Sequence, residues 1–102
     1  MIPEIQALCR KHRLQYLYVT GSLLRPADFR PDSDIDWVFA FDRAAIADED
    51  FLTNFDDFWD GLERTTNRKA DLVHYPSLKN PYFISSVDET KRLVYASEKV
   101  LV

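Results

Sequence analysis

The segment from Asp34 to Phe41 constrains the fold more than any other part of the chain, because its residues alternate between two kinds of side chain. The bulky apolar set consists of Ile35, Trp37, Phe39 and Phe41. The other set consists of Asp34, Asp36, Val38 and Ala40. Successive side chains of a strand point to opposite faces, so this alternation predicts a strand over 35–41. Helices are expected to cover the bulky face, while the carboxylate face stays open.

The two aspartates of this strand form a candidate ion site. Asp34 and Asp36 are two residues apart, so their Cα atoms would lie about 6.5–7 Å apart on one face. Carboxylate oxygens in this arrangement suit Mg²⁺, which completes its shell with phosphate and water. Residues 69–75 predict another strand, and its Asp71 could lie beside Asp36 at about 4.8 Å if the strands pair. Three acids would then converge on a patch that can hold metal ions and accept a proton from an attacking hydroxyl.

A second candidate feature is the Gly21-Ser22 pair, which follows the apolar, strand-forming residues 17–20. The pair predicts a turn out of a strand. If the turn continues into a short helix through Arg25, it leaves backbone N–H groups unpaired above the strand end. Phosphate oxygens are natural ligands for such groups, with the Ser22 hydroxyl and the Arg25 guanidinium as further donors.

The ordered set of motifs resembles a known superfamily. Gly-Ser, the Arg25 that follows, Ser33-Asp34-x-Asp36 and the distant Asp71 are similar to the pattern of polymerase-beta-like nucleotidyltransferases. More narrowly, the chain resembles the minimal nucleotidyltransferase group, from about Leu17 to the C-terminus. Ser-Asp-x-Asp alone would also be compatible with a solvated strand entrance. The resemblance implies a single minimal nucleotidyltransferase domain over residues 1–102, with an α/β fold in which helices pack on one face of a small mixed β-sheet.

The resemblance also implies roles for the motif residues. Those assigned to the nucleotide site are Gly21, Ser22, Arg25 and Ser33. Those assigned to the catalytic triad, which would also bind two Mg²⁺ ions, are Asp34, Asp36 and Asp71. ATP or another nucleoside triphosphate would be the substrate. The loop departs from the family pattern at Leu24 and Pro26, which stand where a small residue and a glycine are usual, and this affects the expected nucleotide affinity.

The implied activity is transfer of a nucleoside monophosphate, AMP from ATP, to an acceptor hydroxyl, which is adenylyltransferase chemistry. Minimal nucleotidyltransferases often pair with a helical HEPN-domain toxin and can modify it by adenylylation. The resemblance therefore implies an antitoxin with a helical HEPN-type protein partner. Two alternatives stay open. One is a catalytically silent antitoxin that acts by binding alone, and the other is a small-molecule nucleotidyltransferase of the antibiotic-resistance type, whose relatives usually carry an additional substrate domain.

Composition excludes several other classes. The chain has 102 residues, with 17 acidic and 13 basic side chains and a net charge of −4. This acidic balance argues against nucleic acid as a direct ligand. The single Cys9 permits no internal disulfide, and the N-terminus lacks the pattern of a signal peptide, so a cytoplasmic location is expected. No apolar run approaches the ~20 residues that a membrane helix needs.

The remaining pattern predicts alternating helices and strands. Helices are expected over 3–12, after the acidic cluster 48–50 and over 81–87, and strands over 16–20, 35–41, 70–75 and 92–96. The acids of 48–50 are expected to cap the first turn of the second helix. In that helix, a set of apolar residues recurs at helical spacing and is expected in the core: Phe51, Leu52, Phe55, Phe58, Trp59 and Leu62. His74, opposite Asp71 on its strand, is expected to be a hydrogen-bonded core residue.

Overall fold

The computed structural model describes residues 2–20 and 34–97. The helices are α1 (Ile2–Lys11), α2 (Phe51–Thr66) and α3 (Pro81–Thr90), and the strands are β1 (Leu14–Thr20), β2 (Ile35–Phe41), β3 (Ala70–His74) and β4 (Arg92–Ala96). Short 3₁₀ turns complete the order: η2 (Arg43–Ala45), η3 (Asp48–Asp50) and η4 (Tyr75–Ser77). None of the helices in the described ranges is long and apolar enough to cross a membrane.

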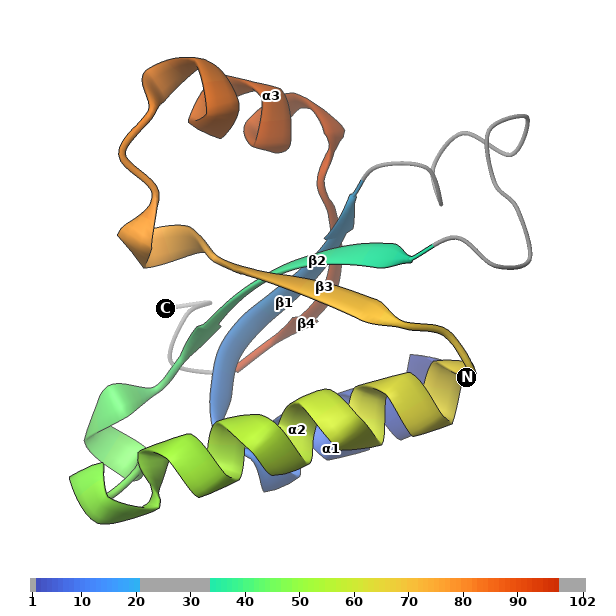
Figure 1. Cartoon of the computed structure of the whole chain (residues 1–102), viewed down its shortest axis with the longest axis vertical. Coiled ribbons are helices and arrows are strands. Elements are labelled where there is room, and N and C mark those ends of the chain that lie inside the picture. Colours follow the sequence, from blue (N-terminus) through green and yellow to red (C-terminus); the bar gives the residue numbers. More distant parts are fainter. Residues whose placement is uncertain (1, 21–33, 98–102) are drawn as a thin grey trace.

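The strands form a mixed sheet in the order β3-β2-β1-β4. Strand β1 is antiparallel to both β2 and β4, whereas β2 and β3 are parallel. Figure 1 shows α1 and α2 together on one side of the sheet and α3 on the other side. The predicted α/β fold, with a mixed sheet and helices packed on one face, is therefore confirmed, and α3 adds a small cover to the second face.

The face of the sheet that α1 and α2 cover, called here the core face, carries the apolar half of the alternating pattern. Leu17, Trp37 and Phe39 are each no more than 2% exposed there. Helix α2 contributes Phe58 and Leu62, both fully buried, as their helical spacing predicts. Two other members of that set do not enter the core: Leu52 is 72% exposed and Trp59 is 38% exposed. The Trp59 indole N–H instead donates to the carbonyl of Ala70, 3.0 Å away.

The opposite face, called here the carboxylate face, carries Asp36 and Asp71 and is less open than the alternation predicts. Val38 and Ala40, which were expected to line an open surface, are each only 1% exposed. The physical reason is that aromatic rings from β1 and η4 and the helix α3 lie over them. Tyr16 makes edge contacts with both Tyr18 and Tyr75, and Val87 of α3 is 5% exposed.

The acidic cluster before α2 does not act as predicted. Asp48–Asp50 form the separate turn η3, and Asp50, at the N-cap of α2, makes no side-chain capping hydrogen bond. The acids still lie at the positive end of the helix dipole, where negative charge is favourable without a specific bond. A side-chain cap is present on α3 instead, where the Asn80 carboxamide oxygen accepts from the backbone N–H groups of Tyr82 and Phe83.

Candidate functional site

Two of the three predicted acids are brought together by the pairing of β2 with β3. In the parallel register Ile35 is the partner of Ala70, Asp36 of Asp71 and Trp37 of Leu72. Partners in neighbouring strands lie about 4.8 Å apart with side chains on the same face, so the predicted juxtaposition of Asp36 and Asp71 is confirmed. Asp34 directly precedes β2 and is exposed.

A tight connection from α2 fixes the position of Asp71. Asn67 ends the helix in the left-handed conformation with φ 56°, and its N–H bonds the carbonyl of Glu63. Asparagine adopts this conformation more easily than most residues. The Glu63 carboxylate accepts a 2.7 Å hydrogen bond from the N–H of Ala70, and the Ile35 N–H donates to the carbonyl of Lys69 at 2.9 Å. These bonds hold the first residues of β3 against β2 and so set the register that pairs Asp71 with Asp36.

The electrostatics of this patch reflect the burial of Asp36 and, to a smaller extent, the like charges beside it. Asp36 is half-buried, and burial raises the pKa of its carboxyl group, with further upward contributions from Asp71 and then Asp34. A cation placed beside Asp36 would favour its ionised form and so reverse that effect. The donor set consists of hard carboxylate oxygens, which fits Mg²⁺ chemically. Within 2–20 and 34–97, however, no three His, Cys, Asp or Glu side chains converge closely enough to hold one ion as they stand.

The residues predicted to bind the nucleotide are not placed. Gly21, Ser22, Arg25 and Ser33 all lie outside the described residues, and so does the departure at Leu24 and Pro26. The last described residue before this segment is Thr20, which is the cross-strand partner of Asp36.

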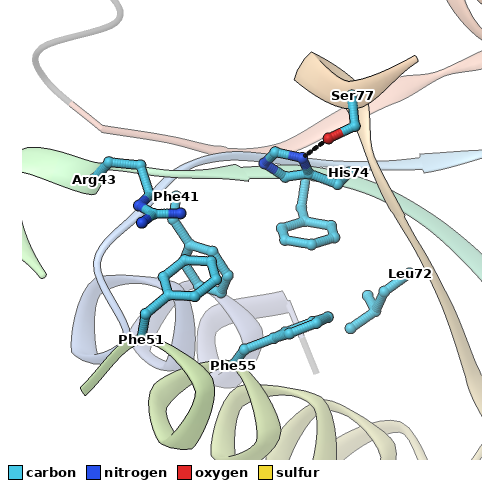
Figure 2. Close-up of a pocket in the computed structure, with 8 residues that line it drawn as sticks. Phe41, Arg43, Phe51, Phe55, Leu72, His74 and Ser77 are labelled. Carbon is cyan, nitrogen blue, oxygen red and sulfur yellow. Dashed lines mark hydrogen bonds between the residues drawn. The ribbon is translucent and has the colours of Figure 1, made fainter. Parts of the chain in front are cut away.

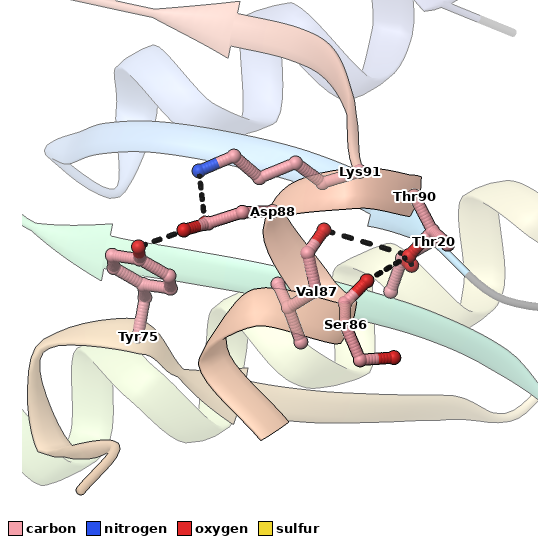
Figure 3. Close-up of polar contacts among 7 residues, drawn as sticks. All are labelled: Thr20, Tyr75, Ser86, Val87, Asp88, Thr90 and Lys91. Atoms are coloured by element: carbon pink, nitrogen blue, oxygen red, sulfur yellow. Dashed lines mark hydrogen bonds and ion pairs between the residues drawn. The ribbon is translucent and has the colours of Figure 1, made fainter. Parts of the chain in front are cut away.

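Sequence analysis missed the contacts that join α3 to the carboxylate face (Figure 3). The hydroxyl groups of Thr20 and Thr90 are hydrogen-bonded to each other, which ties the end of α3 to the strand position beside Asp36. This contact joins residues 70 positions apart, so no local sequence pattern predicts it.

A second group of contacts brings a cation to the same face. The Lys91 ammonium lies 3.0 Å from a carboxylate oxygen of Asp88 and 4.7 Å from the ring centroids of both Tyr18 and Tyr75. The Tyr75 hydroxyl donates to the same Asp88 oxygen at 2.8 Å. The Asp88 and Lys91 pair at helical spacing was the available sequence signal. The Lys91 ammonium therefore lies over two tyrosine rings on the carboxylate face, which also carries Asp36 and Asp71.

His74 lies on the core face, opposite Asp71, as predicted from the alternation of β3. Its Nδ1 is hydrogen-bonded to the Ser77 hydroxyl at 2.6 Å, so the expected hydrogen bond is also present. The side chain is half-buried, and burial lowers the pKa of the imidazole, with a smaller effect from the nearby Arg43. His74 is thus separated by the sheet from the three acids.

Comparisons with known proteins agree with this fold. A family profile described as "Polymerase beta, Nucleotidyltransferase" matches residues 3–100. No curated protein sequence is similar enough to count as a match. A solved structure assigned as a minimal nucleotidyltransferase superposes with a TM-score of 0.70 at 24% identity, covering 89% of this chain and 86% of its own.

Two similar structures are toxin–antitoxin complexes. One contains AMP-PNP and matches with a TM-score of 0.66 at 22% identity, over 97% of this chain and 76% of its own. The other is described as a tri-AMPylated Shewanella oneidensis HEPN toxin with its MNT antitoxin, and matches with a TM-score of 0.60 at 20% identity, over 97% and 72%. At these identities the likeness shows a shared fold.

Proposed function

Since this chain belongs to the polymerase beta nucleotidyltransferase family, we propose that it transfers AMP from ATP to an acceptor hydroxyl on a helical HEPN-type protein partner, as an antitoxin. The observation that carries the proposal is the pairing of Asp36 with Asp71 on adjacent parallel strands, with Asp34 two residues before Asp36. The neighbouring structures support it, because one holds AMP-PNP and another holds an AMPylated HEPN toxin beside an antitoxin.

In this proposal the three acids share the work of holding Mg²⁺, and Gly21, Ser22, Arg25 and Ser33 bind the triphosphate. Bound Mg²⁺ would neutralise charge on the phosphates and orient them. Asp36 contributes the half-buried carboxylate of the set, and burial, with smaller contributions from Asp71 and Asp34, raises the pKa of that group. Asp34 and Asp71 are exposed and free to adjust toward a ligand.

Asp71 is proposed to act at the chemical step. The acceptor oxygen forms a bond to the α-phosphorus, the bond to the bridging oxygen breaks, and pyrophosphate leaves with that electron pair. The hydroxyl proton passes to a carboxylate oxygen of Asp71. Positioned proton transfer of this kind typically contributes 10²–10⁴-fold and is felt in the transition state more than in binding.

A second candidate function, neutralisation of the partner by binding alone, is favoured by one observation. No three acidic, His or Cys side chains in 2–20 and 34–97 converge on a common metal position. A silent site would need no such convergence, whereas an active one requires the carboxylates to turn toward one another when the nucleotide binds.

Single-turnover transfer to a co-expressed HEPN-type partner tests the proposal. Mass spectrometry after incubation with Mg²⁺ and each nucleoside triphosphate should show a mass increase of one AMP on the partner. Asp71→Asn should retain detectable binding of Mg-ATP but transfer about 100-fold more slowly. The matched control is Asp57→Asn, at an exposed position of α2, which should transfer at the wild-type rate.

Two outcomes would contradict the proposal. If the wild-type protein neutralises the partner while no triphosphate adds mass to it, the binding-only function is correct. If Asp71→Asn transfers as fast as Asp57→Asn, Asp71 is not the proton acceptor.

A further inference from the structure

A pocket opens on the core face of the sheet, away from the three acids (Figure 2). Its volume is about 430 Å³, and its apolar walls include Phe39 of β2, Phe55 of α2 and Leu72 of β3. This size falls within the range of pockets that bind small molecules. Leu72 directly follows Asp71 in β3, so the sheet itself separates the pocket from the carboxylate face.

The rim of the pocket carries groups that suit an anion. The Arg43 guanidinium stacks 3.9 Å from the ring centroid of Phe51, with its side chain 57% exposed. Its ion pair with Asp48 spans 3.7 Å to a side chain that is 98% exposed, and such surface pairs hold their partners weakly. The guanidinium therefore keeps donors available for another acceptor, and it is already pre-ordered by the ring beneath it.

His74 and Ser77 stand on the same rim as Arg43, as Figure 2 shows. The bond between Nδ1 of His74 and the Ser77 hydroxyl orients the imidazole and leaves its Nε2 as the second polar atom of the ring. No Asp or Glu is among the described residues that line the pocket. Aromatic walls beneath a rim whose cation is paired only weakly, with the exposed Asp48, are complementary to a flat apolar body that ends in a negative charge.

We propose that this pocket is a binding site for a small aromatic carboxylate. The ring of such a ligand would lie against Phe39 and Phe55, and its carboxylate would pair with the Arg43 guanidinium. Walls from β2, β3 and α2 enclose the space on several sides, which suits a compact free molecule rather than an extended peptide. The site is independent of the proposed transfer reaction, because it lies on the other face of the sheet.

Titration of the protein with naphthoate, followed by backbone amide NMR shifts, tests this site. Saturable shifts should appear at Phe51, Leu72, His74 and Ser77, with half-saturation near or below about 1 mM. Naphthyl methanol, which keeps the rings but lacks the charge, should bind about 10-fold more weakly. Mg-ATP should leave the affinity for naphthoate unchanged, since the two sites are on different faces.

Variants at Arg43 separate a specific site from general hydrophobic adsorption. Arg43→Met should weaken naphthoate about 10-fold while leaving naphthyl methanol unaffected, and Arg43→Lys, which keeps the charge without the planar fork, should fall between. Both substitutions are at an exposed side chain, so the amide spectrum of each variant should still be that of a folded protein. The proposal is overturned if naphthoate gives no saturable shifts, if the shifts lie elsewhere, or if Arg43→Met weakens both probes equally.

Discussion

The two faces of the sheet are held by different kinds of interaction. On the core face, α1 and α2 bury large apolar side chains such as Leu17, Trp37 and Phe58 at 0–2% exposure. On the carboxylate face, α3 is fastened by a hydrogen bond between two hydroxyl groups and by the Lys91 cation over two tyrosine rings. Apolar burial is non-directional and contributes most of the folding free energy. The polar contacts contribute less, but they fix what stands beside Asp36.

This difference indicates that the core face stabilises the fold, whereas the carboxylate face positions polar groups beside Asp36. On the core face, substitutions that reduce side-chain volume are expected to destabilise the fold, because closely packed interiors adjust poorly to a cavity. The carboxylate face tolerates crowded like charges, which a packed interior would not. Substitutions matched across the two faces should therefore differ in kind as well as in size.

The largest expected effect comes from Phe58→Ala on the core face. The ring is fully buried and contacts Phe41 and His12, with centroids 6.1 and 5.9 Å away. Its removal should lower the free energy of unfolding by about 3–5 kcal/mol. The matched variant Phe83→Ala, on α3 where the ring is 45% exposed, should cost about 0.5 kcal/mol or less. Urea unfolding of both variants measures the contrast, and equal losses would show that α3 is packed as tightly as the core.

A smaller effect is expected from Thr90→Val, which removes the hydroxyl partner of Thr20 while nearly preserving shape. Thr20 is only 9% exposed, so its hydroxyl would lose a bond that water cannot readily replace. The loss of unfolding free energy should be about 1 kcal/mol, with faster hydrogen exchange in α3. The control Thr53→Val, at an exposed position of α2, should change neither quantity. Unchanged exchange in α3 would mean that the threonine pair does not anchor the helix.

The smallest effect concerns Asp36→Asn and its dependence on pH. Because the folded protein raises the pKa of Asp36 above the ordinary value of 3.8, ionisation of this group opposes folding. Without divalent cations at neutral pH, the Asn variant should be more stable than wild type by about 0.5 kcal/mol, allowing for solvent screening. The difference should shrink as pH falls through the folded pKa and vanish below 3.8, where the carboxyl is protonated in both states.

Thermal melts across that pH range, with and without Mg²⁺, measure this effect. Mg²⁺ should stabilise the wild type more than the Asn variant. A wild-type protein that is the more stable of the two at neutral pH without Mg²⁺ would show that burial and the neighbouring carboxylates do not oppose ionisation of Asp36.

Local periodicity was sufficient to predict most of the fold. The strands 35–41 and 92–96 are as predicted, and 70–75 ends one residue earlier, because each shows alternation bounded by turn residues. Strand β1 begins earlier than predicted, at Leu14, because a register shift between Leu14 and Tyr16 interrupts the alternation. Helix α3 runs on to Thr90, three residues past its predicted end, where Thr90 bonds Thr20.

The candidate site was predictable where it depends on strand register and not where it depends on distant packing. Alternation predicted the face of Asp36, and Asp71 was expected beside it if the two strands pair, which the register confirms. The cover over Val38 and Ala40 could not be foreseen, since it comes from tyrosines and a helix that are far away in sequence. The pocket beside Arg43 likewise joins residues of five elements, β2, η2, α2, β3 and η4. The roles given to the acids and to the nucleotide loop stay predictions.

The short connection between α2 and β3 also limits how the length of this chain can change over evolution. Three residues, 67–69, separate the end of the helix from the start of the strand. The Ala70 N–H donates to the Glu63 carboxylate, and the Ile35 N–H donates to the Lys69 carbonyl, so hydrogen bonds hold both sides of that link. An insertion or deletion of one residue there would turn Asp71 to the opposite face, because side chains in a strand alternate. The longer connection 42–50 carries no such constraint on the acids. Among relatives, insertions and deletions should therefore be common in the connection 42–50 and rare in the connection 67–69.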